Sequence, residues 1–358
     1  VILWLQNSHA APIPAQAVSL DRMGAAAPVP IDCAVPGFAT VAVAMADYLP
    51  DVHWPAQIEL RAGRHAVRPR YEAVRAGRTR IAHVNVERAD LLPDPGIKSL
   101  GNALGRGFLL PFPVLPQAAF RTIVQPNPMA HSECGTPIRL DIFDREGRCV
   151  AERFLGVLSR DHGVAVEVEA PGLDEGHAEL VYDFRDGGQA NGWLHALMRY
   201  EHRASGHAAD TSFGAHVFNT AMTYKDEPQS YSGPPPGLTT RLFLKLGDGN
   251  LGDGNLRDGG RRSFGCLIYP ASAPWHARSQ TALVLHDGAG RPIAERAVEI
   301  ACSGSATVRP HEMFGDALLR EAGPRGYVLI RDATCRLFGY HGLEGAGGAF
   351  SLDHMFGF

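Results

Sequence analysis

Residues 144–153 read DREGRCVAER and residues 287–296 read DGAGRPIAER, so six of ten positions are identical at an offset of 143. In both copies an Asp stands three positions before a Gly, which is typical of a tight turn with glycine in the left-handed conformation. The residues before each turn alternate between apolar and polar, as Ile138, Leu140 and Ile142 do in the first copy. A period of two predicts half-buried strands, so each copy is expected to be a β-hairpin.

Three shorter matches extend this repeat toward the N-terminus in the same order. They pair residues 120–126 with 264–270, residues 82–84 with 215–217, and residues 70–72 with 199–201. A few long repeats predict tandem domains, because the units of a solenoid have only about 20 to 45 residues.

The two ends of the chain are also related in sequence. Residues 5–23 match residues 337–355 without a gap, with seven identities in nineteen positions. This match predicts that the N-terminal segment is folded and is not the remnant of a signal peptide. The chain starts at Val1 and not at Met, so we expect its true N-terminus to lie upstream.

The composition agrees with an all-β protein. Short predicted strands at close spacing, with 40 Gly and 26 Pro, are typical of antiparallel sheets joined by turns. We predict tandem antiparallel β-sandwich units, jelly-roll or Ig-like, from an internal duplication, with short helices over residues 38–49 and 312–321. The expected domains are an N-terminal β region with an Arg-rich hairpin (1–86), a first sandwich repeat (87–219) and a second (220–358).

The charge balance and the cysteines limit the possible partners and compartment. The 34 basic and 38 acidic residues give a net charge of -4, which argues against a dominant nucleic-acid surface. No apolar run approaches the roughly 20 residues of a membrane span. Six separated cysteines without a CxxC pair favour a cytoplasmic protein over a disulfide-bonded secreted one.

An arginine-rich segment is the first candidate site. Seven arginines fall between residues 61 and 80, and a turn at Ala76-Gly77 is expected to place two pairs of them on one face. Arginine forks on one face bind carboxylate, phosphate or acidic polysaccharide. Neighbouring glutamates that neutralise the segment, or a subunit contact, are open alternatives. The candidate anion ligands are Arg68, Arg70, Arg78 and Arg80.

Polar side chains that recur at a spacing of thirteen or fourteen residues are a second candidate. Two members of a pair could lie side by side on a hairpin and hold a metal or an anion. The alternative, which the repetition favours, is a histidine that bonds the backbone at a sandwich corner. The pairs are His9 with Arg22, His341 with His354 and His202 with His216, and His83 matches His216 in the shorter repeat.

The densest group of metal-ligand residue types is His202, His207, Asp210 and His216. Two or three histidines with a carboxylate can hold a divalent metal that activates water or oxygen. The spacing matches no HxH or HExxH pattern, so a structural cluster is the favoured interpretation.

No GxSxG motif, P-loop or diagnostic carboxylate pair is present in the sequence. The leading hypothesis is therefore a non-catalytic binding or interaction protein without a cofactor, whose partner is a small anionic or carbohydrate ligand or another protein. Oligomers are possible, whereas nucleic acid and membranes are not expected. The alternative is a metal-dependent enzyme that acts on a small molecule or sugar through the His/Asp cluster.

Overall fold

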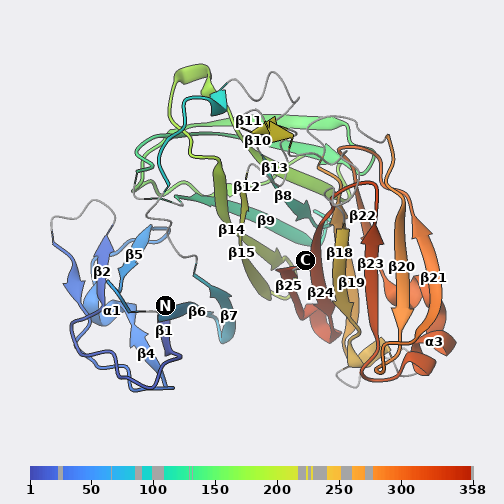
Figure 1. Cartoon of the computed structure of the whole chain (residues 1–358), viewed down its shortest axis with the longest axis horizontal. Helices are drawn as coiled ribbons and strands as arrows, with labels where there is room; N and C mark the ends of the chain where they lie inside the picture. The colour runs from blue at the N-terminus through green and yellow to red at the C-terminus, as the bar shows by residue number, and fades with distance from the viewer. Residues whose placement is uncertain are drawn as a thin grey trace.

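The computed structural model describes residues 1–22, 27–65, 67–84, 91–98, 109–128, 130, 132–216, 223–224, 227–228, 240–250, 260–270 and 277–355. The chain is nearly all β, as expected, with half of it in strands. The sheets are antiparallel and follow one another along the chain as tandem sandwiches (Figure 1).

The first sandwich consists of two sheets from residues 2–83, with strand orders β4-β1-β6-β7 and β3-β2-β5. Their inner faces share one core, in which Leu5 and Leu20 are fully buried. The strands are β1 (Ile2–Asn7), β2 (Ser19–Arg22), β3 (Val29–Pro30), β4 (Thr40–Ala44), β5 (Ile58–Arg61), β6 (Val67–Arg75) and β7 (Arg78–His83).

The second sandwich has the strand orders β11-β10-β13-β8 and β12-β9-β14-β15. Its eight strands run in chain order from residue 109 to residue 216. They are β8 (Leu109–Val114), β9 (Phe120–Asn127), β10 (Thr136–Asp144), β11 (Cys149–Leu158), β12 (Val166–Glu167), β13 (Gly176–Tyr182), β14 (Trp193–His202) and β15 (Ala208–His216).

The third sandwich has the orders β18-β23-β20-β21 and β22-β19-β24-β25. Counted along the chain, its eight strands pair as those of the second sandwich do, so the two share one topology. They are β18 (Thr240–Lys245), β19 (Arg262–Ile268), β20 (Thr281–His286), β21 (Pro292–Val298), β22 (Ser305–Val308), β23 (Tyr327–Asp332), β24 (Phe338–Glu344) and β25 (Phe350–His354). A two-stranded sheet, β16 (Thr223–Tyr224) with β17 (Glu227–Pro228), precedes it.

The repeated decapeptide forms the same hairpin turn in both sandwiches, as predicted. Gly147 and Gly290 have φ of 86° and 84°, and each donates its N–H to the carbonyl of the Asp three residues earlier. The carboxylates of Asp144 and Asp287 accept the backbone N–H of Arg148 and Arg291 at 2.8 and 2.9 Å. The Arg148 and Arg291 side chains also donate from Nε to the same carboxylates at 2.7 Å. The turn therefore uses the Asp, the Gly and the Arg, which are three of the six identical positions.

Alternating residues of β10 pack in the core as predicted, since Ile138, Leu140 and Ile142 are at most 3% exposed. The sheets of all three sandwiches fall within the expected domains 1–86, 87–219 and 220–358. The limits themselves stay a prediction, because residues 85–90 and 217–222 lie outside the described residues.

The match between the chain ends is not a structural equivalence. It aligns β1 with β24 and β2 with β25, yet β24 and β25 are neighbours in one sheet while β1 and β2 belong to different sheets. The folded N-terminus that the match predicted is nevertheless present as β1.

One predicted helix is only partly helical. Within residues 38–49 the segment TVAVA forms β4, which pairs with β1, and only α1 (Met45–Tyr48) is helical. Alternating valines favour a strand wherever a partner strand is available. The other predicted helix is α3 (Pro310–Ala322), which is interrupted at Gly315. No helix in the described ranges is long and apolar enough to cross a membrane.

The second and third sandwiches share a continuous apolar interface. Strand β19 is buried on both faces, with Leu267 in the core of the third sandwich and Cys266 in contact with the core of the second. A strand covered on both sides needs an apolar run, which residues 264–268 (FGCLI) supply. The hydroxyl of Tyr340 also donates to the Pro111 carbonyl at 2.6 Å.

Two fully buried tyrosines test this interface. Tyr340→Phe should lower the free energy of unfolding by about 1–2 kcal/mol, because the substitution leaves the buried Pro111 carbonyl without its donor. Tyr200→Phe is the matched control, since the hydroxyl of Tyr200 is buried and has no hydrogen-bond partner. Urea unfolding should show the control unchanged or more stable, and equal losses in both variants would contradict the assignment.

Candidate binding groove

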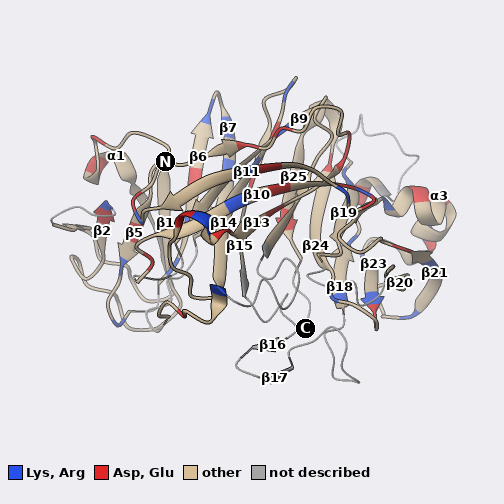
Figure 2. Ribbon diagram, turned by 90° about the horizontal axis from the view of Figure 1, so that it is seen from above, with Lys and Arg blue, Asp and Glu red and all other residues tan. Residues whose placement is uncertain are grey.

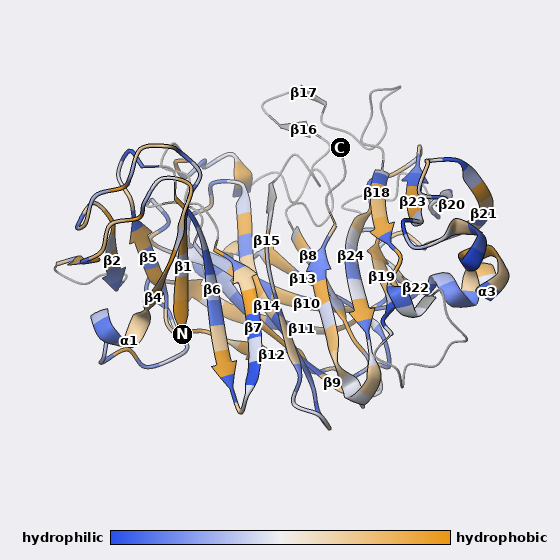
Figure 3. Cartoon of the chain, turned by 90° about the horizontal axis from the view of Figure 1, so that it is seen from below, coloured by the Kyte–Doolittle hydropathy of each residue, from blue (hydrophilic) through white to orange (hydrophobic). Residues whose placement is uncertain are grey.

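A groove with a volume of about 700 Å³ separates the first sandwich from the second. Pockets of about 300–1,000 Å³ accommodate small ligands. Its floor is aliphatic and consists of inward-facing residues of the first sandwich, Leu3, Leu20, Ile58, Leu60 and Ala73. In Figure 3 much of β1 and β5 is coloured as hydrophobic. Leu3, Leu20 and Ala73 are at most 8% exposed, whereas Ile58 and Leu60 are half-buried, so the groove borders the core of the first sandwich along β5.

The opposite wall is the outer face of the second sandwich. On β9, Val124 is buried in the core of that sandwich, while the alternating neighbours Ile123 and Gln125 line the groove. Strand β14 adds Leu197 and Arg199 to the same wall. The groove thus combines an apolar floor with a mixed polar wall.

A buried carboxylate joins the two walls. Asp210 on β15 has a fully buried side chain, and it accepts hydrogen bonds from Tyr71 Oη at 2.9 Å, Arg80 Nε at 2.8 Å and Arg199 Nε at 3.2 Å. Tyr71 and Arg80 lie on the β6–β7 hairpin, so Asp210 holds that hairpin against the second sandwich. Burial, followed by the Asp210 charge, raises the pKa of Tyr71 far above its usual range, so its phenol remains a donor.

The charged residues of the second sandwich near the groove are also paired. Arg121 contacts Glu167 at 2.6 Å and Glu201 at 3.5 Å, and Arg203 contacts Glu167 at 3.4 Å. The hydrogen bond from Arg121 is the main cause that lowers the pKa of Glu167. This ion network stabilises the wall and leaves little uncompensated charge there.

The four predicted anion ligands do not share a face. Strand register places Arg80 opposite Ala73 on the inner face of β6 and β7, and Arg70 opposite Trp4 and His83 on the outer face. Arg78, two residues before Arg80, lies on the same inner face, and its Nη1 is 2.6 Å from His207 Nε2. Arg68 lies on the outer face with Arg70, because positions two apart on a strand point the same way.

The predicted metal cluster is not assembled. Asp210 is held by arginines, His207 contacts Arg78, and the Nδ1 of His202 lies 2.8 Å from Ser205 Oγ. His216 pairs with Trp193, at the opposite end of the β14–β15 hairpin from His202. No group of three or more metal-ligating side chains was found in the part of the chain that the structure describes. Cationic neighbours make Asp210 and His207 unsuitable for a divalent metal.

The histidine pairs also do not lie side by side. His341 is opposite Asp353 and His354 is opposite Tyr340, so the two histidines point to opposite faces of their sheet. His9 follows β1 and Arg22 lies on β2, in the other sheet of the first sandwich.

Two of the repeated histidines do meet, where β7, β15 and the C-terminal strand β25 come together. The rings of His83 and His354 are 5.5 Å apart, and His354 also packs on Phe213 at 4.8 Å. Burial, followed by the charges of His83 and His354, lowers the pKa of the nearby His195 to about 3. Sequence repetition identified His83 and His354, whereas nothing in the sequence pointed to His195.

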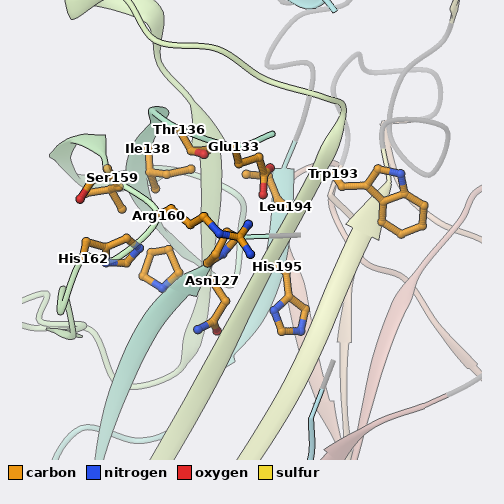
Figure 4. Close-up of a pocket in the computed structure, with 13 residues that line it drawn as sticks. Asn127, Glu133, Thr136, Ile138, Ser159, Arg160, His162, Trp193, Leu194 and His195 are labelled. Atoms are coloured by element: carbon orange, nitrogen blue, oxygen red, sulfur yellow. The ribbon is translucent and has the colours of Figure 1, made fainter. Parts of the chain in front are cut away.

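A second cavity, of about 20 Å³, lies under His195 and Arg160 (Figure 4). This volume holds about one water molecule. Arg160 is already engaged there, with Nη1 2.6 Å from the Ala130 carbonyl and Nη2 3.3 Å from Glu59. The small cavity is therefore too small for an organic ligand, and the groove is the better candidate site.

The sequence also gave no indication of a row of carboxylates across β11, β10 and β13. Strand register places Asp141 opposite both Glu152 and Glu179, and Glu179 Oε1 lies 3.1 Å from His177 Nε2. Burial raises the pKa of Asp141, although Arg139 forms a salt bridge with it. These residues line neither of the two cavities above.

Comparisons with known proteins do not assign the chain to a family. No family model and no curated protein matches the sequence. Among the solved structures that match is one named "Biofilm associated protein - BSP domain", with 12% identity and a TM-score of 0.23. The match covers 76% of this chain, and this chain spans only 59% of that one.

Removal of the Asp210 charge tests the junction between the sandwiches. Asp210→Asn should lower the free energy of unfolding by about 2–3 kcal/mol, because two arginines lose their buried partner. The expected loss is smaller than the roughly 3–5 kcal/mol typical of fully buried ion pairs, because the Arg199 side chain is 30% exposed. Glu201→Gln, at the more open end of the network, should cost less than about 1 kcal/mol in the same urea titration. A smaller loss of stability for Asp210→Asn than for Glu201→Gln would show that Asp210 does not hold the two sandwiches together.

The His195 environment predicts a dependence of stability on pH. The pKa of His195 is about 3 in the folded protein and about 6.5 in the unfolded chain. As pH falls below 6.5, the unfolded chain therefore binds a proton at His195 that the folded protein does not bind. Stability is thus complete above pH 6.5 and declines by up to about 1.4 kcal/mol per pH unit toward pH 3. Urea unfolding at pH 7.5 and 5.5 should show a smaller decline for His195→Gln than for the wild type. His53→Gln, at an exposed position, should keep the wild-type decline, and identical declines in all three proteins would refute the assignment.

Proposed function

We propose that this chain is a non-catalytic interaction protein that binds its partner in the groove between the first and second sandwiches. The observation that carries the proposal is the groove of about 700 Å³ whose floor is aliphatic. β-Sandwich domains usually bury their aliphatic residues. An apolar groove with polar groups along its edge is therefore typical of a binding site.

The groove residues support binding more than catalysis. Asp210, Arg80 and Arg199 are occupied with one another, and Glu167 is held by two arginines. Side chains that are fixed in ion pairs stabilise the walls of the groove. They are poor proton donors or acceptors for a substrate, because their polar atoms already have partners. The groove therefore resembles a preformed surface for recognition.

The lining also favours one class of ligand. The floor is aliphatic, and the exposed Arg75 at the groove makes no ion pair with any described residue. Trp54, which is 52% exposed, adds an apolar surface at the same groove. An apolar ligand with acidic groups, as a protein segment can provide, complements this lining better than a carbohydrate does. The exposed pair Arg68 and Arg70 stays a separate candidate for a small anion.

An anionic apolar dye tests the groove directly. 1-Anilinonaphthalene-8-sulfonate should bind the native protein at one site, since its rings fit the floor and its sulfonate complements Arg75. Ala73→Phe should fill the groove and weaken binding at least tenfold. Fluorescence titration measures this affinity.

The control is Ile81→Phe, which adds an aromatic ring on the same hairpin but on its exposed outer face. It should bind the dye as the wild type does. Equal binding by wild type and Ala73→Phe, or no binding by the folded wild type, would refute the groove as the site.

A further inference from the structure

The outer face of the sheet β4-β1-β6-β7 carries a second candidate site, on the opposite side of this sheet from the groove floor. Strand register aligns its side chains in rows that cross the strands. One row is Ala42, Trp4, Arg70 and His83, and the next is Thr40, Gln6 and Arg68. Gln6, Arg68 and Arg70 are exposed and Trp4 is half-buried, so this face is open to solvent. We call Trp4, Gln6, Arg68 and Arg70 the Trp4 face.

The indole of Trp4 is held in a fixed orientation. Its Nε1 donates to Glu72 Oε2 at 2.8 Å, across the β1–β6 pairing. Because the only polar atom of the ring is engaged, the indole offers a ligand an apolar surface. A ring that is already fixed also loses little conformational freedom when a ligand stacks on it.

The two arginines beside Trp4 are free to bind an anion. Arg68 and Arg70 form no ion pair with any described residue, whereas Arg80, on the inner face of the same hairpin, is held by Asp210. Figure 2 shows basic residues on both β6 and β7. Positions two apart on a strand are separated by about 7 Å, so the two forks can hold neighbouring acidic groups of one ligand.

The carboxylates close to the Trp4 face already have partners. Glu72 accepts the Trp4 N–H, and Asp353, near His83, lies 3.1 Å from His354 Nδ1. Two arginines and Glu72 leave a net positive charge on this face, although the whole chain has a net charge of -4. The charge of the face therefore complements an acidic ligand.

We propose that the Trp4 face binds an acidic oligosaccharide. One sugar ring stacks on the Trp4 indole through its apolar C–H groups, and Arg68 and Arg70 bind carboxylates of this sugar and its neighbour. The Gln6 amide lies where it can bond a hydroxyl group. The site shares no residue with the groove, so it is independent of the proposed function.

The pairing of the strands favours a sugar over an acidic peptide. β1 lies between β4 and β6, and β6 lies between β1 and β7. The backbone beneath Trp4, Arg68 and Arg70 is thus paired on both sides, and an extended peptide finds no open strand edge there. A ligand that stacks and presents carboxylates, without needing backbone partners, suits this face better.

Tri-galacturonate, a linear trisaccharide with one carboxylate on each sugar, is a suitable probe. Isothermal titration calorimetry with the full chain at low ionic strength should show one site. Arg70→Gln should weaken binding at least tenfold, and it should leave the fold intact, because the exposed Arg70 side chain has no described ion-pair partner. Trp4→Ala should weaken binding similarly, and Trp4→Phe, which keeps an aromatic ring, should restore part of the affinity.

Arg75→Gln is the matched control, since Arg75 is an exposed arginine of the same strand that lines the groove instead. This variant and Ala73→Phe, which fills the groove, should bind tri-galacturonate as the wild type does, whether or not the dye binds the groove. Neutral maltotriose should bind the wild type at least tenfold more weakly. Equal binding of tri-galacturonate by wild type and Arg70→Gln, or of maltotriose and tri-galacturonate by the wild type, would overturn the proposal. Equal binding of tri-glutamate would show recognition of charge alone and would also overturn it.

Discussion

A buried carboxylate determines how the first sandwich sits on the second. Asp210 accepts hydrogen bonds from Tyr71, Arg80 and Arg199, so one charge compensates two arginines and fixes the β6–β7 hairpin. Hydrogen bonds to charged groups are directional, and they hold two surfaces together without requiring close apolar packing. The junction can therefore stay open beside Asp210, and the opening is the groove. The apolar interface around β19, between the second and third sandwiches, has the opposite character.

The groove follows from a difference between otherwise similar units. The second and third sandwiches close their cores with a strand beside β13 and β23. The first has the same order of strands but ends at β5, so Ile58 and Leu60 face a hollow. Among the described residues β5 pairs with β2 alone, so its other backbone edge lies beside the apolar floor of the groove.

The sequence predicts the local elements well, because turns and strand alternation are local properties. The Asp-to-Gly turns at residues 144–147 and 287–290 and the alternation of Ile138, Leu140 and Ile142 all appear in the structure. The strand at residues 40–44 was mistaken for a helix, because its pairing with β1 is a contact between distant residues.

The site is less predictable, since it depends on which strands become neighbours. Composition identified the arginine-rich hairpin but not that Arg70 and Arg80 point to opposite faces. Spacing grouped Asp210 with His207 as metal ligands, although their actual partners, Arg80 and Arg78, lie about 130 residues earlier. The groove is lined by residues of two sandwiches that are distant in sequence, and no local motif records that they become neighbours.

Hydrogen exchange of the free protein tests the open edge of β5 most directly. Half of the amides of Ile58–Arg61, those directed away from β2, should exchange far faster than the corresponding amides of β13 and β23, which have a strand on each side. Equal protection of β5, β13 and β23 at neutral pH would show that this edge of β5 is closed and would contradict an open groove beside it.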